Sequence, residues 1–372
     1  MKITVSKEEL VNGLQAVQNV VGARSTLPIL SNVLLVADGK SLEMRATDLE
    51  TTIIGAVEAQ VEQPGMTTLP AKRLFGLARE IESGEIEIKV DTKDKCIVQS
   101  GASVYKLNGI AAEDFPPLPK FKETNQVTLK QSQLKEMLRK VSYAISTDES
   151  RFVLNGVFVK LDGIKIILVA TDGRRLAKAE EEEIEGKATG EFIVPSKAVG
   201  ELSRLLGADG EVSIRQGETQ VEFTLSKEGT EPVKIYSKLV EGSYPNYDQV
   251  IPKETKERPF ERIALGREEL LHALRRADQV TSDKANSVTL TFGDNNLTIN
   301  ANSPEIGEGR ESLAIKYKGG EIKVSFNPGF LMDVLKILES DEVYMELSDG
   351  LNPGVIKATP GFLYVLMPMR TN

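Results

Sequence analysis

ITVSKEELVNGLQAVQNVV, residues Ile3–Val21, is the first of three copies of one pattern in this chain of 372 residues. The second copy is VTLKQSQLKEMLRKVSYAI, Val127–Ile145, and the third is IALGREELLHALRRADQVT, Ile263–Thr281. Each copy joins a short alternating segment to apolar residues spaced i, i+4 and i+7, which form one face of a helix. The matching core positions are Leu10, Leu134 and Leu270; Leu14, Leu138 and Leu274; and Val17, Val141 and Ala277. Because repetition in sequence reflects repetition in structure, the pattern predicts three similar domains.

A second helix is predicted in each repeat. Its copies are LPAKRLFGLAREI from Leu69, VPSKAVGELSRLL from Val194 and FNPGFLMDVLKIL from Phe326. Pro70 and Pro195 suit a helix start, where a missing N–H costs nothing. Alternating segments typical of strands follow, as at Ile86, Ile88 and Val90. We therefore predict an α+β fold in which every domain is a duplicated strand–helix–strands unit, with six helices in the chain.

The repeats also set the expected domain boundaries. We predict domains over residues 1–119, 127–252 and 263–372. The charged stretches FKETNQ and KETKERPFER indicate linkers near 120–126 and 253–262. Three similar domains in a row leave an unpaired edge at each end of the chain. Head-to-tail contacts of this kind either continue as a filament or close into a ring, built by one chain or by two.

Composition excludes several classes of protein. The single Cys96 cannot form a disulfide within the chain, which fits a reducing compartment. With one His and one Cys, no His/Cys metal site can be assembled, and no phosphate-binding glycine loop is present, so we expect neither a metal nor a cofactor. The start, MKITVSKEEL, lacks the apolar core of a secretory signal, and no apolar run is long enough to span a membrane. We therefore expect a cytoplasmic protein with no membrane association.

An enzyme is the class with the least support. Asp48 and Asp172 occupy equivalent ATD positions of the first two repeats, where a hydrolase would pair them as general acid and base. They belong to separate predicted domains, however, and the third repeat has only Asn300–Asn302 at that point. We interpret both aspartates as turn or cap carboxylates. His272 lies in a helical pattern and is interpreted as a structural or surface residue, so no catalytic residue is predicted.

The net charge of −9 argues against binding to nucleic acid, yet the cations are unevenly spread. They recur at equivalent helix positions: Lys72 with Lys197, Arg79 with Arg204, and Arg139 with Arg275. One interpretation is that they are solvated helix ends that complement the helix dipole. The other is a surface that faces a polyanion. Because no aromatic side chains cluster beside the cations, such a surface would contact the backbone of a duplex rather than stack on single strands.

Seven segments carry a family resemblance: ARSTLPILSNVLL (Ala23–Leu35), ATDLE (Ala46–Glu50), FPPLP (Phe115–Pro119), RFVLNGV (Arg151–Val157), VATDGRRLA (Val169–Ala177), SKLVEGSYPNYDQVIP (Ser237–Pro252) and the terminal MPMR. With them the whole chain resembles the bacterial DNA polymerase III beta subunits, the sliding clamps. The resemblance implies a head-to-tail homodimer, nucleoid-associated, whose six domains form a ring around duplex DNA with helices inside and sheets outside. A ring holds DNA by topology, so a weakly basic lining in an acidic body suits sliding.

The resemblance and the helix register together predict the residues that face DNA. The family implies contacts at Arg24 and around Arg73 and Lys197. The register of the basic helices supplies the other positions, so that the full prediction is Arg24, Lys72, Arg73, Arg79, Lys135, Arg139, Lys197, Arg204, Arg275 and Arg276. In the loop Asp148–Val153 the chain departs from relatives that carry Gln and Tyr residues there to touch DNA.

The family also implies a pocket for short apolar peptide motifs between the middle and last domains. It receives the replicative DNA polymerase catalytic subunit, the clamp-loader complex and other replication and repair proteins. Independently, a chain end of Val365–Met369 places flexible thioethers where a core is seldom completed, although a plain terminal core strand is the alternative. Arg174 and Ala285 replace residues frequent in relatives. The matching pocket positions are Leu154, Thr171, Gly173, Arg175, Leu176, Pro245, Val250, Asn327, Phe330, Val365, Leu366, Met367, Pro368, Met369 and Arg370.

The family places the ring interface near Tyr105 and Leu107 in the first domain and near Gln279 and Val280 in the last. The predicted function is therefore a non-enzymatic processivity clamp, which tethers the polymerase and other partners to duplex DNA as a homodimer. The alternative is a repeat-built peptide-binding scaffold that does not encircle DNA.

Overall fold

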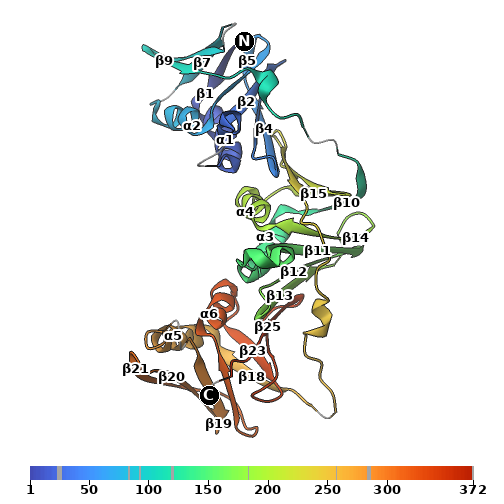
Figure 1. Ribbon diagram of the computed structural model, residues 1–372, viewed down its shortest axis with the longest axis vertical. Helices are drawn as coiled ribbons and strands as arrows, with labels where there is room; N and C mark the ends of the chain where they lie inside the picture. Colours follow the sequence, from blue (N-terminus) through green and yellow to red (C-terminus); the bar gives the residue numbers. More distant parts are fainter. Residues whose placement is uncertain are drawn as a thin grey trace. The chain divides into compact units, whose positions relative to one another are not determined.

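The computed structural model describes residues 1–22, 27–82, 84–91, 94–118, 121–182, 184–256, 258–282 and 286–370 (Figure 1). Within these ranges it contains six α-helices, the number predicted from the repeats. They are α1 (Lys7–Val17), α2 (Ala71–Glu80), α3 (Gln131–Val141), α4 (Ser196–Leu205), α5 (Arg267–Asp278) and α6 (Pro328–Ile337).

The helices form where capping and apolar spacing agree. The side chains of Ser6 and Asn327 cap α1 and α6, since each accepts a hydrogen bond from the backbone N–H three residues further along. Pro70 and Pro195 lie one position earlier than predicted, because each ends a strand and the helix begins at the next residue. The predicted core positions of the first helix in each repeat are all buried: Leu10, Leu14, Val17, Leu134, Leu138, Val141, Leu270, Leu274 and Ala277.

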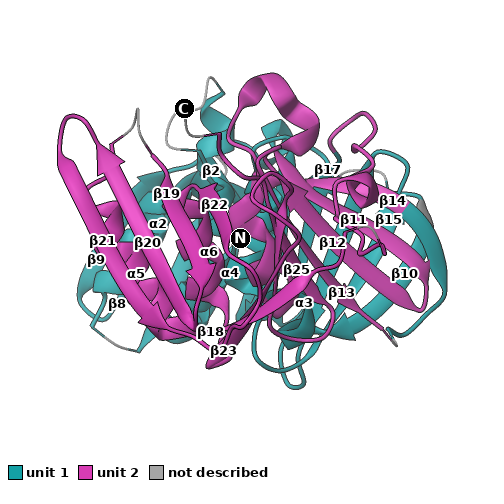
Figure 2. Cartoon of the chain, turned by 90° about the horizontal axis from the view of Figure 1, so that it is seen from below, with its two compact units in different colours: residues 1–135, 184–190, 197–239 teal, residues 136–183, 191–196, 240–372 magenta. Residues whose placement is uncertain are grey.

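The chain divides into two compact units, which Figure 2 colours separately. Unit 1 comprises residues 1–135, 184–190 and 197–239, and unit 2 comprises residues 136–183, 191–196 and 240–372. The middle repeat is divided between the two units, because its strands extend the sheets of both neighbouring repeats.

Unit 1 holds two antiparallel sheets. The first has the order β5-β1-β7-β8-β9 and consists of β1 (Lys2–Ser6), β5 (Gln60–Gln63), β7 (Glu85–Val90), β8 (Lys95–Ser100) and β9 (Ser103–Asn108). The second has the order β10-β15-β16-β17-β4-β3-β2-β6 and consists of β2 (Asn32–Asp38), β3 (Ser41–Thr47), β4 (Thr51–Glu58), β6 (Gly65–Pro70), β10 (Glu123–Lys130), β15 (Glu211–Gly217), β16 (Gln220–Ser226) and β17 (Val233–Lys238). Helix α1 packs against both α2 and β4.

Two further sheets lie in unit 2, apart from the first residues of β14. One has the order β14-β11-β12-β13-β25-β24-β23-β18 and consists of β11 (Gly156–Gly163), β12 (Lys165–Thr171), β13 (Arg175–Glu181), β14 (Ala188–Pro195), β18 (Glu261–Gly266), β23 (Glu342–Leu347), β24 (Gly354–Lys357) and β25 (Phe362–Leu366). The other has the order β21-β20-β19-β22 and consists of β19 (Val288–Gly293), β20 (Asn296–Ser303), β21 (Gly307–Ala314) and β22 (Ile322–Phe326). Helix α5 packs against α6, β20 and β21.

Each eight-stranded sheet is a junction between two successive repeats. In one of them β4 of the first repeat pairs with β17 of the second, with Ile53 opposite Ile235. In the other, β13 of the second repeat pairs with β25 of the third, with Ala177 opposite Tyr364. The two junctions therefore use the same pair of strands of the repeat. The α+β fold of three similar repeats that the sequence predicts is confirmed.

Both predicted linkers turn out to be partly strand. Strand β10 begins at Glu123, inside the predicted linker 120–126, and strand β18 begins at Glu261, inside the predicted linker 253–262. Both are edge strands of their sheets. Ladder hydrogen bonds join backbone groups, and one flank of an edge strand is not paired, so charged side chains are well tolerated there. A run of charge by itself therefore did not mark a linker.

The core includes the single cysteine of the chain. Cys96 is fully buried on β8, and burial raises the pKa of its thiol to about 12. It therefore stays protonated and unreactive near neutral pH.

None of the described helices combines the length and the apolar character needed to cross a membrane. Within the described ranges, no three His, Cys, Asp or Glu side chains gather as ligands for a metal ion would.

Candidate functional site

An apolar cluster covers one face of the unit 2 sheet where β13 meets β25. Phe158 stands opposite Val169 across one pair of strands, and Leu176 stands opposite Val365 across another, so their side chains share a face. The ring of Phe158 also stacks on that of Tyr244, with centroids 4.8 Å apart. The buried members of this apolar cluster are Phe158, Ile167, Val169, Leu176, Ile193, Tyr247 and Val365.

Four exposed apolar side chains lie within four residues, along the chain, of members of this cluster or of residues packed against it. Phe152 is 57% exposed and precedes Val153, which packs against the cluster. Val250 is 47% exposed and precedes Ile251, which does the same. Met367 and Met369, 42% and 39% exposed, follow strand β25. We call Phe152, Val250, Met367 and Met369 the apolar rim. Exposed apolar side chains beside an apolar core are typical of a surface that receives a partner.

The C-terminal segment of the rim is held by its backbone rather than by its side chains. The Met367 N–H donates to the carbonyl of Arg174 at 2.9 Å, and the Met369 N–H donates to the carbonyl of Ser325 at 2.7 Å. Strand β25 itself ends at Leu366. The alternative of a plain terminal core strand therefore holds only as far as Leu366, and both thioether side chains beyond it reach solvent.

Arg175, at the start of β13, is the most firmly anchored side chain near the cluster. Its guanidinium donates to the carboxylates of Asp172 at 3.0 Å and of Asp333 at 2.7 Å, and to the carbonyl of Tyr143 at 2.7 Å. It also lies over the ring of Phe330, 4.3 Å from its centroid. With a side chain only 10% exposed, Arg175 ties the turn before β13 to helix α6.

The electrostatics of this network suit an anchor rather than a catalyst. Burial acts to lower the pKa of Arg175, but Tyr364, Asp333 and Asp172 outweigh it and raise that pKa. For the two tyrosines burial has the opposite effect: it disfavours the charged phenolate and raises the pKa of Tyr143 and of Tyr364 well above the ordinary range. A general acid or base is most effective with a pKa near the working pH, and none of these three groups is tuned that way.

Replacing Arg175 with Met should lower the free energy of unfolding by about 3–5 kcal/mol, because it leaves two carboxylates without their buried cation. Arg174, its exposed neighbour, serves as the matched control, and Arg174→Met should change stability by less than about 0.5 kcal/mol. Urea unfolding followed by circular dichroism measures both variants. Equal stabilities of the two variants would contradict the anchoring role.

The predicted pocket residues divide into supports and surface. Leu154, Leu176, Val365 and Leu366 are buried, so they carry the surface from beneath. Asn327 caps α6. The exposed members are Gly173, Pro245, Val250, Met367, Met369 and Arg370, while Thr171, Arg175, Phe330 and Pro368 are half-buried. Position Ala285 lies outside the described residues.

Sequence reasoning missed three side chains of this site. Asp333 binds Arg175, Tyr143 gives it a carbonyl and an aromatic face, and Tyr244 stacks on the cluster. Tyr244 stands within the quoted SKLVEGSYPNYDQVIP segment, which was a usable signal. Asp333 and Tyr143 had no such signal in the sequence, since Asp333 is one polar residue within the amphipathic helix α6 and Tyr143 is one residue just after α3.

The two ATD aspartates are turn carboxylates, as predicted. Asp172 accepts hydrogen bonds from the N–H groups of Arg174 and Arg175, at 2.9 and 3.0 Å. Asp48 accepts them in the same way from the two equivalent N–H groups, at 2.9 and 2.6 Å. The residue after each aspartate has a left-handed backbone: Gly173 at φ +85° and Leu49 at φ +78°. Both carboxylates are thus held within their own turns.

Half of the cations predicted to face DNA are already engaged with other protein groups. Lys135 donates to the carbonyl of Leu206 at 2.8 Å, and Lys197 binds the Asp48 carboxylate. Arg276 pairs with Glu311 at 2.6 Å. Arg139 and Arg204 bind carbonyls of neighbouring helices, at 2.5 to 3.0 Å.

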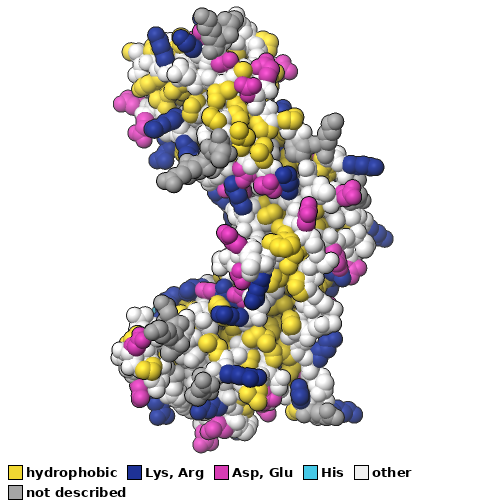
Figure 3. Space-filling model, in the orientation of Figure 1, with side chains coloured by type: hydrophobic (Ala, Val, Ile, Leu, Met, Phe, Trp, Pro, Cys, Tyr) yellow, Lys and Arg dark blue, Asp and Glu magenta, His cyan; other side chains and the backbone are white. Residues whose placement is uncertain are grey.

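The other predicted cations are exposed. Lys72, Arg73, Arg79 and Arg275 reach solvent, and among the described residues none of them forms an ion pair or donates a side-chain hydrogen bond. Arg24 lies outside the described residues. On the face drawn in Figure 3, Lys and Arg side chains alternate with Asp and Glu rather than forming one basic patch. This mixture fits weak contacts with a polyanion better than tight binding.

The residues predicted at the ring interface lie on or beside two of the edge strands, β9 and β21. Strand β9, with Tyr105 41% exposed, is the last strand of its sheet, and β21 is the last strand of another. Gln279 and Val280 follow α5, and Val280 lies against Gly309 of β21. Both strands therefore have one flank of backbone groups without a neighbouring strand.

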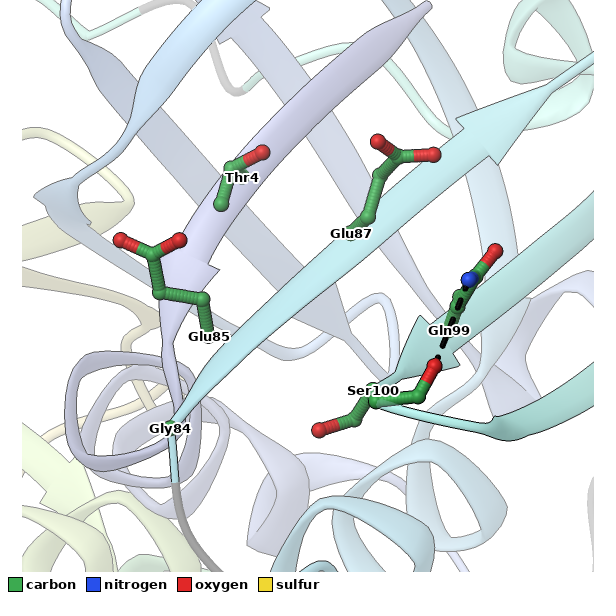
Figure 4. A pocket seen from close by; sticks show the side chains of 7 residues that line it. Thr4, Gly84, Glu85, Glu87, Gln99 and Ser100 are labelled. Carbon is green, nitrogen blue, oxygen red and sulfur yellow. Dashed lines mark hydrogen bonds between the residues drawn. The ribbon is translucent and has the colours of Figure 1, made fainter.

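A shallow hollow of about 450 Å³ lies on the five-stranded sheet. Figure 4 shows Glu85 and Glu87 of β7 beside Thr4 of β1, with Gln99 bonded to the carbonyl of Gly101 at 3.4 Å. Two carboxylates without further ligands do not make a metal site. We assign this hollow no role.

Comparison with known proteins covers the whole chain. Three family models, described as the N-terminal, central and C-terminal domains of the DNA polymerase III beta subunit, match residues 1–119, 128–246 and 248–370. The beta sliding clamps of Chlamydia muridarum and Escherichia coli K12 are 34% and 35% identical, over 100% of this chain and 99% and 100% of theirs.

Solved structures agree in fold. The sliding clamp of Pseudomonas aeruginosa, solved with a ligand, superposes with a TM-score of 0.93 at 33% identity and 100% coverage of both chains. The clamp of Bartonella birtlesii, solved bound to griselimycin, gives 0.92 at 34% identity, again over 100% of both chains. The predicted clamp fold is confirmed. The chain therefore belongs to the DNA polymerase III beta subunit family, the family of the beta sliding clamps.

Proposed function

We propose that two copies of this clamp close head to tail into a ring that encircles duplex DNA and confers processivity on the replicative polymerase. The observation that carries the proposal is the match to clamp relatives over the entire chain, combined with open edges at β9 and β21. The predicted domains over 1–119, 127–252 and 263–372 are part of the same proposal: three per copy make six in the ring.

Contact with DNA is proposed to be weak and independent of base sequence. Lys72 and Arg73 are exposed cations without an ion pair among the described residues, so they are available to phosphates. Each phosphate contact adds affinity through counterion release, and many such contacts would oppose sliding. The few available cations and the net charge of −9 therefore favour retention by topology over retention by affinity.

The apolar rim is proposed to receive short apolar motifs of the polymerase catalytic subunit, the clamp loader and other replication and repair proteins. Support comes from the exposure of these four apolar side chains, each of which follows or precedes a segment that belongs to or packs against the buried cluster. Further support is that one relative, the clamp of Bartonella birtlesii, was solved bound to griselimycin. We propose that the protein itself catalyses no reaction. The energy for ring opening would then come from a clamp loader. We propose that the protein acts in the cytoplasm.

Retention on closed DNA tests the ring. After loading with a cognate loader and ATP, the protein should remain on a nicked circular plasmid and leave when a restriction enzyme linearises that plasmid. Gel filtration of the DNA, followed by immunoblotting, measures the bound fraction. Equal retention on circular and linear DNA would favour the peptide-binding scaffold instead.

A further inference from the structure

Both junctions between repeats contain an arginine that caps a helix of the neighbouring repeat. Arg204 on α4 donates to the carbonyls of Gln15 and Ala16, in the last turn of α1, at 3.0 and 2.8 Å. Arg139 on α3 donates to the carbonyl of Ile337, the last residue of α6, at 2.5 Å. The last carbonyls of a helix lack partners within it, and a cation there also complements the helix dipole.

The two arginines come from different positions of the repeat. Arg204 belongs to the second helix of its repeat, and the equivalent position in the other junction is Lys336, which pairs with Asp333 at 3.6 Å. Arg139 belongs to the first helix of its repeat, and the equivalent position in the other junction is Gln15. Each internal junction thus uses one of two available capping positions.

Helix α2 of the first repeat and helix α5 of the third repeat have no neighbouring repeat within the chain at the corresponding junction, and their capping positions are both arginine. Arg79 on α2 is equivalent to Arg204, and Arg275 on α5 is equivalent to Arg139. Both are exposed, and within the described part of the chain neither guanidinium donates a hydrogen bond; Arg79 only lies over its own helix neighbour Phe75, at 5.7 Å. Two capping residues are therefore present without the helix ends that their equivalents bind.

The strand registers show how these ends would meet. Strand β9 is equivalent to β17 and β25, because it occupies the same place in the strand pairing of its repeat. The residues that stand opposite one another across three successive strands are Ile88, Val98 and Tyr105 in the first repeat, Ile214, Phe223 and Ile235 in the second, and Met345, Ile356 and Tyr364 in the third. Strand β21 is equivalent to β4 and β13, because Met44 faces Gly55, Leu168 faces Ala179 and Ile299 faces Glu311.

Transfer of the internal register to these two edges gives specific pairs. Ile235 faces Ile53 and Tyr364 faces Ala177, so Tyr105 of one copy would face Gly309 of another. The same register sets Lys106 against Glu308, an opposite-charge pair that stabilises an antiparallel edge.

We propose that the junction between two copies is closed by reciprocal arginine caps. Arg79 of one copy donates to the carbonyls of Arg275 and Arg276 of the second, each of which accepts one hydrogen bond from Gln279 of its own chain and has a second lone pair for the cap. Arg275 of the second copy donates to the carbonyl of Glu80 of the first. Glu82 there takes the place of Glu339, which pairs with Arg139 at 3.1 Å. This rests on the proposed head-to-tail ring, and it assigns Arg79 and Arg275 to the subunit junction rather than to the surface that faces DNA.

The test measures the dissociation constant of the two-copy ring for Arg79→Ala and Arg275→Ala by sedimentation velocity at nanomolar to micromolar concentration. Each variant should dissociate at least about tenfold more readily than the natural chain, the loss expected for charge-assisted hydrogen bonds. Arg73→Ala is the matched control, an exposed arginine on the same helix, and its dissociation constant should not change. Thermal melting of each variant confirms that all fold.

The outcomes separate this inference from the proposed function. A natural chain that stays monomeric throughout would overturn both. A dimeric natural chain whose dissociation constant is unchanged in Arg79→Ala and Arg275→Ala would overturn the caps alone. If those variants then lose retention on circular DNA while the dimer stays intact, the two arginines face DNA as the sequence predicted, and the caps are refuted.

Discussion

Deleting residues 367–372 should weaken binding of the replicative polymerase on the order of a hundredfold while the ring stays intact. The deletion removes Met367 and Met369, whose exposed side chains form half of the apolar rim. Fully burying a methionine contributes roughly 1.5–3 kcal/mol, and the lower end applies because both side chains are already more than half buried. Two anchors together then contribute about 3 kcal/mol, the energy of roughly a hundredfold change in affinity. Strand β25 ends at Leu366 and keeps its pairing with β13 and β24.

Surface plasmon resonance with the polymerase catalytic subunit measures that loss, and sedimentation velocity measures the ring. The double variant Met367→Ala, Met369→Ala should reproduce most of the effect without shortening the chain. Met66, 54% exposed on β6 of unit 1, is the matched control, and Met66→Ala should bind as the natural chain does. A ring that falls apart on deletion would show that the tail is structural, and unchanged affinity would place the partner surface elsewhere.

The sequence predicted the helices and their buried faces more fully than it predicted which groups the basic side chains bind. Rows such as Leu10, Leu134 and Leu270 determine where each helix faces, because a helix can bury only one stripe and repetition confirms which stripe it is. Arg139 and Arg204 show the limit. A basic residue at a helix end has the same periodicity whether it meets a phosphate or a backbone carbonyl, and only the position of the neighbouring helix decides between them.

The exposure of the side chains at the end of β25 was predicted in part, while their role as a partner surface stays a prediction. The residue types of Val365–Met369 predicted exposed thioethers, and Met367 and Met369 are indeed exposed. What anchors that surface, the contact of Arg175 with Asp333, joins residues far apart in the chain and leaves no pattern in either segment. The turn at Asp172 lies between these cases, since the ATD motif repeats and its hydrogen bonds are local.

Cysteines placed at Val104 and Arg310 should lock the ring onto circular DNA. The transferred register sets these two exposed residues of β9 and β21 opposite each other in neighbouring copies, as Lys234 faces Ile54 and Leu363 faces Lys178. Residues directly opposite on antiparallel strands have Cβ atoms roughly 4.5–5.5 Å apart, close enough for a disulfide after a small adjustment. After loading and oxidation, the double variant should stay on a nicked circle through a detergent wash, whereas the natural chain should be removed completely.

Because detergent abolishes every non-covalent contact, only a closed loop around closed DNA can survive that wash. Linearising the plasmid should therefore release the crosslinked protein, and oxidation before loading should prevent loading altogether. Cys96 does not confuse the result, since it is buried and the pKa of its thiol is raised to about 12. The matched control pairs Val104→Cys with Glu311→Cys, because a slip of one residue turns the second thiol to the opposite face of the sheet. Equal crosslinking of both pairs would refute the register, and detergent-resistant protein on linear DNA would refute the topological link on which the clamp function depends.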